Sequence, residues 1–310
     1  MRIAIIGQQD FGKAVLDAFV ARGDQVAGVF CAPEKPGAKA DPLRTAAEEK
    51  GLKVFQFPSL RAPEAHAALE GLNADLGVMA YVLQFAPDSL VRVPKHGTIQ
   101  YHPSLLPKYR GPSSINWPII KGEKKTGLTI FRPNEGLDEG PLELQKETPI
   151  GPDDTLGSVY FERLFPMGVQ AMVEAADLVL AGKHKEIVQN EAEASYEGWC
   201  RAAEAKIAWA THVDFVYDLI RGTNPAPGAW TTLNGKKLQI FDARKHLFRT
   251  FGAVKGKPGE VSEITATSVF VTAQGGRIEV LKAKAEDGKK ASAPEVAAAL
   301  GIAVGTLLGT

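Results

Sequence analysis

The residues best suited to chemistry lie in two places, a histidine loop and an acidic turn. His102 follows a β-type run, has Gln100 two residues before it, and opens a loop that contains three prolines. Asp138 lies in a later turn between Gly136 and Gly140. Proline fixes φ and removes an N–H, so the loop after His102 is expected to be rigid and irregular. The alternatives are a Pro-rich surface connection for the loop and ordinary turn chemistry for Asp138.

An imidazole and a carboxylate brought together suit acyl transfer between heteroatoms. A carbonyl is attacked, an oxyanion develops, and a poor amine leaving group must gain a proton. The N–H of His102 can donate to the oxyanion, and the carboxylate of Asp138 can orient the imidazole and relay protons. Gln100 points the same way as His102 on an alternating strand, so its amide is a second candidate donor. These three side chains are the predicted catalytic residues.

Other mechanisms have little support in the sequence. The His, Cys, Asp and Glu residues show no metal-ligand spacing, and there is no nucleophile elbow or phosphate-binding loop. We therefore expect a site without a metal. The two cysteines, Cys31 and Cys200, are far apart and cannot form a disulfide framework, which fits a reducing, cytoplasmic setting.

An α/β architecture is predicted to position these residues. The chain opens with a strand at 2–6, a helix ending near Gly23 and a strand at 25–30, which is typical of a Rossmann-like sheet. Further strands are expected at 53–56, 75–81, 97–101, 127–131 and 143–150, and helices at 42–51, 62–72, 114–121 and 156–181. The first glycines have the spacing G-x4-G and the second strand ends without an acid, so NAD(P) binding is not expected.

The pattern changes after a connector at 183–205. A helix at 213–221 is followed by five short expected strands, 230–233, 237–243, 259–264, 268–272 and 277–283, and by a helix at 293–300. Five short strands with turn signals suggest a small barrel. The prediction is a Rossmann-like catalytic domain over residues 1–205 and an OB-like barrel domain over residues 206–310.

Composition sets few further limits. The 310 residues are enough for two domains, and the formal net charge is zero, from 36 basic and 36 acidic side chains. Neither the net charge nor the overall composition requires a nucleic-acid partner. No signal peptide is recognised, and no apolar run approaches the ~20 residues of a membrane helix, so no membrane partner is expected.

At the two chemical motifs the sequence resembles the folate-dependent formyltransferase family. The run His102-Pro-Ser-Leu-Leu-Pro-Lys-Tyr-Arg-Gly111 is similar to the family's His…S-L-L-P-x-x-R-G signature, and Gly136-Leu-Asp138-Glu-Gly140 to its downstream D-x-G. The resemblance covers nearly the whole chain and includes Lys206-Ile-x-Trp209 and Pro227-Gly-Ala-Trp230.

The resemblance implies a fold, a donor and a set of site residues. It implies a Rossmann-like domain followed by an OB-like barrel, 10-formyltetrahydrofolate as formyl donor, and His102 and Asp138 as catalytic residues. It places the pterin of the folate between the turn before Asp138, at Asn134 and Gly136, and an apolar loop. The residues of that loop are Val82, Leu83, Gln84, Phe85 and Ala86. From the residues alone, this loop suits either the floor of a flat aromatic ligand or plain core packing.

The formyl acceptor stays open. The family's transferases carry Asn where this chain has Gln100, and the nearest overall likeness is to the hydrolase domain of 10-formyltetrahydrofolate dehydrogenase, where that residue is apolar. The short loop Ala32–Asp41 lacks the longer basic loop of methionyl-tRNA formyltransferases, which weakens a tRNA acceptor.

Three alternatives follow: methionyl-tRNA formylation, nucleotide-sugar formylation, or a non-enzymatic RNA-binding role for the barrel. Because the chain ends at Thr310, activity is expected to stop at formyl removal or transfer. The bond between Leu106 and Pro107 is expected to be cis.

Overall fold

The computed structural model describes residues 1–250 and 255–310, which form two compact units. The first unit contains residues 1–111, 127–148 and 163–196, and the second contains residues 112–126, 149–162 and 197–310. The predicted domain boundary at residue 205 stays a prediction, and each unit is described by itself below. No helix among the described residues combines the length and apolar character needed to span a bilayer.

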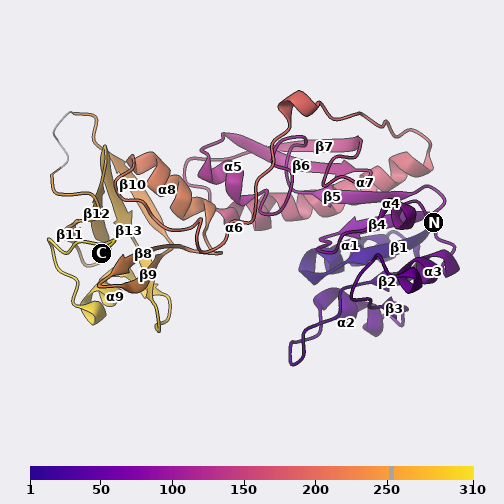
Figure 1. Cartoon of the computed structure of the whole chain (residues 1–310), viewed down its shortest axis with the longest axis horizontal. Coiled ribbons are helices and arrows are strands. Elements are labelled where there is room, and N and C mark those ends of the chain that lie inside the picture. Colours follow the sequence, from indigo (N-terminus) through magenta and orange to yellow (C-terminus); the bar gives the residue numbers. More distant parts are fainter. Residues whose placement is uncertain (251–254) are drawn as a thin grey trace. The chain divides into compact units, whose positions relative to one another are not determined.

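The first unit is built on a seven-stranded mixed sheet with the order β3-β2-β1-β4-β5-β6-β7 (Figure 1). Its strands are β1 Arg2–Gly7, β2 Gln25–Phe30, β3 Val54–Phe55, β4 Leu76–Ala80, β5 Thr98–His102, β6 Lys125–Phe131 and β7 Leu142–Pro149. The first five pair in parallel, whereas β5 and β6 are antiparallel. The apolar runs of β1 and β4 are almost wholly buried, as expected for parallel strands covered on both faces.

Helices cover the two faces of this sheet. They are α1 Gln9–Ala21, α2 Pro42–Glu49, α3 Pro63–Gly71, the short α4 Asp88–Val91, which was not predicted, and α7 Phe165–Leu180. Ala4 and Ile6 of β1 pack in one apolar cluster with residues of α3 and α4. The ring of Phe11 in α1 packs against Tyr101 of β5 and Phe165 of α7, on the other face. The predicted Rossmann-like arrangement is therefore confirmed.

The predicted helix at 156–181 is interrupted. Thr155 caps α6 Leu156–Val159 with a capping box that includes Ser158, so the helix begins at residue 156 as predicted. A π-helical turn, η1 Tyr160–Leu164, then precedes α7. Pro166 has no N–H to give to the carbonyl four residues earlier, which accounts for a change of helical register at this point.

The second unit contains two four-stranded antiparallel sheets around one core. The sheet orders are β10-β13-β12-β11 and β15-β14-β9-β8. The strands are β8 Ala229–Leu233, β9 Lys236–Ile240, β10 Ala243–Leu247, β11 Val261–Ile264, β12 Val269–Ala273, β13 Gly276–Val280, β14 Lys282–Ala285 and β15 Ala291–Ser292. The helices are α5 Asn116–Ile120, α8 Val213–Gly222 and α9 Ala293–Leu300, with a 3-10 turn η2 Glu191–Glu193 in the first unit. Val216 of α8, Ile240 of β9, Ile278 of β13 and Val296 of α9 belong to the same apolar cluster.

The expected count of five strands in this region was wrong, since the described residues form eight. Two of the expected runs, 237–243 and 277–283, each divide into two strands that belong to different sheets. At the division Phe241 N donates to Lys282 O and Leu281 N donates to Asp242 O. Strands that bend at a corner can pass from one sheet to the next, and a sequence pattern of period two does not show the bend. Both sheets are antiparallel, which agrees with a separate all-β domain after the connector, and the OB-like topology stays a prediction.

Candidate functional site

The alternation of β5 sets the direction of the predicted site. Tyr101 points to the face that carries α1 and α7, where its ring meets Phe11. Thr98, on the opposite face, donates its hydroxyl to Val91 O of α4. Because side chains of a strand alternate, Gln100 and His102 share the face of Thr98.

The imidazole of His102 is buried and has two polar neighbours. Its Nε2 lies 2.8 Å from Tyr109 O, and its Nδ1 lies 3.5 Å from Oδ2 of Asp138. A carbonyl oxygen only accepts, so the proton is assigned to Nε2, which donates to Tyr109 O. The nitrogen that faces the Asp138 carboxylate is therefore Nδ1. Sequence reasoning did not foresee that Nε2 is taken up by the loop itself.

The proline loop is held by a hydrogen bond within the loop and by two hydrogen bonds to the neighbouring strand β6. Ser104 Oγ donates to Lys108 O at 2.7 Å, and Thr129 Oγ1 of β6 donates to Ser104 O at 2.7 Å. Thr129 Oγ1 also accepts from Leu106 N at 3.1 Å. The bond between Leu106 and Pro107 is cis, as predicted. The expected rigid loop is thus fixed to the neighbouring strand.

Asp138 is buried and has a left-handed backbone with φ of 57°. Its Oδ2 accepts from Gly111 N at 2.8 Å, at the end of the proline loop. Its Oδ1 accepts no hydrogen bond from any residue that the structure describes. One carboxylate oxygen thus links the acidic turn to the histidine loop, while the other is free to meet a ligand.

Gln100 is half-buried, and within the described part of the chain its side-chain amide has no hydrogen-bond partner. An amide without an internal partner on the face of His102 is able to donate to a ligand oxygen. Its predicted catalytic role, like those of His102 and Asp138, stays a prediction.

The apolar loop after β4 combines exposed and buried side chains. Leu83 is 58% exposed and Phe85 is 41% exposed, whereas Ala86 is buried in the apolar cluster of α3 and α4. Gln84 Nε2 donates to Phe57 O at 2.9 Å and to Pro58 O at 3.0 Å, which fixes the loop. Val82 also packs against the cluster that contains Ala86. Core packing therefore accounts for Ala86, and the exposed Leu83 and Phe85 are the side chains open to a flat ligand.

A small pocket lies at the carboxyl ends of β1 and β2 and includes part of this loop. Gly7, Phe30, Val82, Leu83 and Gln84 are among its lining residues. β1 is the strand at which the sheet order reverses, and α/β sheets commonly bind ligands in the crevice at such a position.

The turn before Asp138 contains the two remaining predicted ligand contacts. Asn134 Oδ1 accepts from Gly136 N at 2.9 Å, so Asn134 stabilises the turn from within. A Cβ atom at Gly136 would lie 2.9 Å from Glu139 Cβ and 2.2 Å from its Oε2, so a larger residue here would require the Glu139 side chain to move. The contact of either residue with a pterin stays a prediction.

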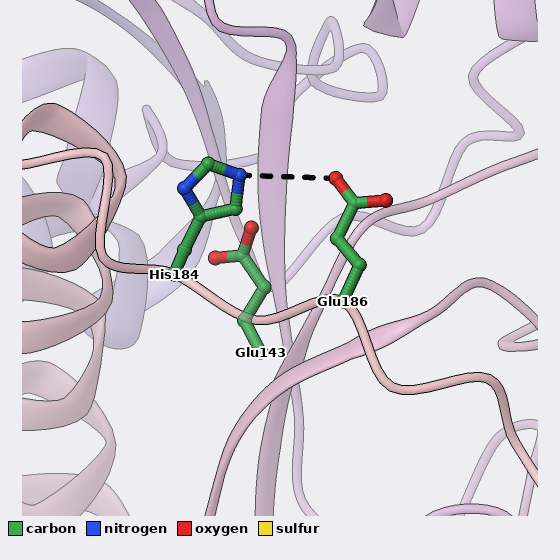
Figure 2. A group of neighbouring side chains, drawn as sticks. All are labelled: Glu143, His184 and Glu186. Atoms are coloured by element: carbon green, nitrogen blue, oxygen red, sulfur yellow. Dashed lines mark ion pairs between the residues drawn. The ribbon is translucent and has the colours of Figure 1, made fainter.

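A second group of a histidine and two acids lies elsewhere in the first unit (Figure 2). Glu143 comes from β7, and His184 and Glu186 come from the chain after α7. One ligand atom from each lies within 4.8 Å of the others, and Nε2 of His184 is 3.9 Å from Oε1 of Glu186. Arg132 Nε donates to the buried Glu143 and lies 3.9 Å from Oε1 of Glu186. A cation here would have to share both carboxylates with this guanidinium, so the group gives no basis for assigning a metal.

Comparison with known proteins decides the family. The family model described as "Formyl transferase" matches residues 1–176, and the model described as "Formyl transferase, C-terminal domain" matches residues 200–301. The chain belongs to the formyl transferase family. The first model contains His102, Asp138, Gln100 and the apolar loop, so both motifs that suggested the family fall inside it.

The relatives of this formyl transferase family member differ in length. The chain is 44% identical over 248 residues to cytosolic 10-formyltetrahydrofolate dehydrogenase of Mus musculus, which covers 78% of this chain and 27% of that protein. It is 34% identical to methionyl-tRNA formyltransferase of Syntrophus aciditrophicus (strain SB), over 99% of this chain and 98% of that protein. The chain therefore spans about a quarter of the length of the dehydrogenase.

A solved structure shares the fold. HypX from Aquifex aeolicus, in complex with tetrahydrofolic acid, has a TM-score of 0.66 and 20% identity, over 96% of this chain and 47% of that chain. At this identity the likeness concerns the fold alone.

Proposed function

We propose that this chain removes the formyl group of 10-formyltetrahydrofolate and passes it to water or to an amine. The observation that carries the proposal is the 3.5 Å approach of His102 Nδ1 to Asp138 Oδ2, in a family whose members are formyl transferases. A folate donor is supported by the relative named 10-formyltetrahydrofolate dehydrogenase and by the tetrahydrofolic acid complex of HypX.

Two side chains, His102 and Gln100, act on the formyl carbonyl, and Asp138 acts on the nucleophile. His102, in its protonated form, donates Nδ1–H to the formyl oxygen, because its Nε2–H is already given to Tyr109 O. The free amide of Gln100 is the second donor to that oxygen. Donors aimed at a developing oxyanion lower the barrier in a site that is already organised.

Asp138 accepts the proton that the nucleophile loses. Its Oδ1 accepts a proton from the attacking water or amine, directly or through a water molecule, as the new bond to the formyl carbon forms. The bond between that carbon and N10 of the folate then breaks, and N10 receives the proton. The products are tetrahydrofolate and either formate or a formylated amine. The step balances without an oxidant such as a nicotinamide and without a metal ion.

The acceptor divides the proposal into two candidates. Hydrolysis to formate agrees with the 44% identity to a 10-formyltetrahydrofolate dehydrogenase. Methionyl-tRNA as acceptor agrees with the end-to-end match to the Syntrophus enzyme. We favour the first candidate because the loop after β2, residues 32–41, is short and carries only two basic side chains, Lys35 and Lys39. Contacts of basic side chains with phosphates normally supply much of the affinity for a nucleic acid.

One assay tests the donor and the acceptor together. The chain is incubated with 10-formyltetrahydrofolate alone, with charged initiator tRNA, and with an amino-sugar nucleotide, and tetrahydrofolate, formate and formylated product are measured separately. We expect tetrahydrofolate and formate in equal amounts with the donor alone. A formylated product formed in preference to formate moves the assignment to that acceptor. Tetrahydrofolate formation no faster than without protein, under all three conditions, contradicts the proposal.

A further inference from the structure

The chain from Ile187 to Tyr196, here called the strap, contacts both loops of the candidate site. At one end, Ile187 and Leu142 of β7 exchange backbone hydrogen bonds of 2.9 and 2.8 Å. At the other end, Arg110 N donates to Ser195 O at 2.8 Å, and Tyr109 N donates to Ser195 Oγ at 2.9 Å. Tyr109 is the residue whose carbonyl accepts from His102, so the strap supports the histidine loop from outside.

Gln189 lies in the strap, and its buried side chain reaches the acidic turn. Its Nε2 donates to Asp138 O at 2.8 Å and to Gly140 O at 2.7 Å. Its Oε1 accepts from Arg110 Nη2 at 2.9 Å and from Nε at 3.2 Å. A side-chain amide offers two donors and two acceptor positions, so all four are in use. Since guanidinium only donates and a carbonyl only accepts, this environment defines which end of the amide carries oxygen.

The hydrogen bonds of Gln189 stabilise the backbone at Asp138, which has an uncommon conformation. Asp138 has a positive φ, a conformation that persists only where the surrounding structure fixes it. Gln189 holds the carbonyl of Asp138 itself and that of Gly140 two residues later. The direction of the Asp138 carboxylate therefore depends on an amide about fifty residues further along the chain.

Arg110 stabilises this arrangement from its other side. Its guanidinium bonds Glu191 through Nη2 at 2.6 Å and Nη1 at 3.0 Å, and the Glu191 carboxylate raises the pKa of Arg110. The guanidinium of Arg110 thus bonds both Gln189 and Glu191.

We propose that Gln189 is a positioning residue for formyl transfer, which holds the Asp138 carboxylate toward His102 through the two carbonyls of the acidic turn. The proposal rests on the proposed function of His102 and Asp138. Misplacing a catalytic group by about 1 Å can cost about 10²-fold in rate, so loss of this support has a measurable effect on turnover.

The test compares four variants of the full chain with the wild type, one of which is Asp138→Asn. Gln189→Met keeps the length of the side chain and removes all four hydrogen bonds. Gln189→Glu keeps the acceptor for Arg110 and loses the donors to Asp138 O and Gly140 O. Val188→Ala, at a neighbouring residue that is 85% exposed, is the matched control. Tetrahydrofolate formation is measured against donor concentration and pH.

We expect Gln189→Met and Gln189→Glu to lower kcat about 10- to 100-fold, with KM for 10-formyltetrahydrofolate within about twofold of the wild type. The pH–rate profile of each Gln189 variant should differ from that of the wild type, and Val188→Ala should match the wild type. Equal effects in both Gln189 variants would assign the function to the donors rather than to the contact with Arg110.

Three results would overturn the proposal or separate it from the proposed function. Wild-type kcat and pH profile in Gln189→Met, with Asp138→Asn inactive, would remove Gln189 from the account and leave the function intact. A loss explained by a smaller folded fraction, with an unchanged profile, would show a merely structural role. Wild-type turnover in Asp138→Asn would refute the proposed function itself. If Gln189→Met does not fold, by circular dichroism, Gln189→Glu decides.

Discussion

Two groups of the first unit bring a histidine to a carboxylate, and they differ in how their polar atoms are used. In the His102 and Asp138 pair, His102 Nε2 donates to Tyr109 O and Asp138 Oδ2 accepts from Gly111 N. In the group of Glu143, His184 and Glu186, Glu143 Oε2 and His184 Nδ1 are buried and have no partner among the described residues.

The positions of the two groups differ as well. His102 ends a parallel strand in the middle of the sheet, whereas Glu143 lies at the start of the edge strand β7. Burial raises the pKa of Glu143, against the opposing effect of Arg132. A histidine near acids is therefore not by itself evidence of a site. What distinguishes the first pair is that backbone groups fix each ring and carboxylate while Asp138 Oδ1 and Gln100 stay available.

The largest expected effect separates the two histidines. His102→Ala should lower kcat about 10²- to 10³-fold, since it removes a donor to the oxyanion. His184→Ala should stay within about twofold of the wild type. Both are measured as tetrahydrofolate formation with saturating donor. Near-wild-type turnover in His102→Ala, or a comparable loss in His184→Ala, would cancel the distinction between the two groups.

Gln100 gives a smaller effect on the same reaction. Gln100→Leu removes the amide and should lower kcat about 10²-fold, at the lower end of the range for an oxyanion donor. Gln100→Asn keeps an amide and should retain more activity than Gln100→Leu. Equal kcat values for the wild type and Gln100→Leu would show that the amide does not act in the transition state.

The second group is expected to matter for stability. Glu143→Ala leaves the mostly buried Arg132 guanidinium without its carboxylate, which should lower the free energy of unfolding by about 2 kcal/mol. The matched substitution Glu186→Ala, at a half-exposed carboxylate 3.9 Å from Arg132, should change it by less than about 0.5 kcal/mol. Urea unfolding measures both. A fall in kcat per folded molecule in Glu143→Ala would place this group in the function after all.

The smallest expected effect is that of Glu34, a carboxylate whose pKa is lowered, whereas the pKa of Glu143 is raised. The Asp41 N–H, followed by the Gln56 amide, lowers the pKa of Glu34 to about 2. A lowered pKa means that this group stabilises the folded state above its usual value of 4.5, and that the contribution is lost as the pH falls toward 2. Glu34→Gln should therefore lower the thermal midpoint at pH 7 and match the wild type near pH 2. A midpoint difference that does not depend on pH would contradict this account of Glu34.

The parts of the fold with local causes could be predicted from the sequence. The parallel strands follow from short, fully apolar runs, and the helix start at residue 156 follows from the Thr155 cap. The proline loop after His102 was expected because prolines restrict the chain whatever surrounds them. His102 and Asp138 were predicted together because their side chains suit one reaction, and the 3.5 Å distance between them agrees with that prediction.

The features that depend on distant partners could not be predicted. The corner at Phe241 and Asp242 depends on pairing with residues 281 and 282, and no periodicity marks it. Gln189 lies in a stretch that looked like a connector, and its importance comes from carbonyls at residues 138 and 140. A single glutamine among polar residues carries no signal of burial. The orientation of His102, with Nε2 given to Tyr109, likewise depends on a loop conformation that only coordinates define.

The most direct test of the central claim is the rate of tetrahydrofolate formation by Asp138→Asn. This variant keeps the size of the side chain and removes its charge, and tetrahydrofolate is released whichever acceptor takes the formyl group. The account predicts a rate at least about 10²-fold below that of the wild type, with the variant folded and still binding folate. A rate equal to that of the wild type would show that the His102 and Asp138 pair is not where the formyl group is transferred.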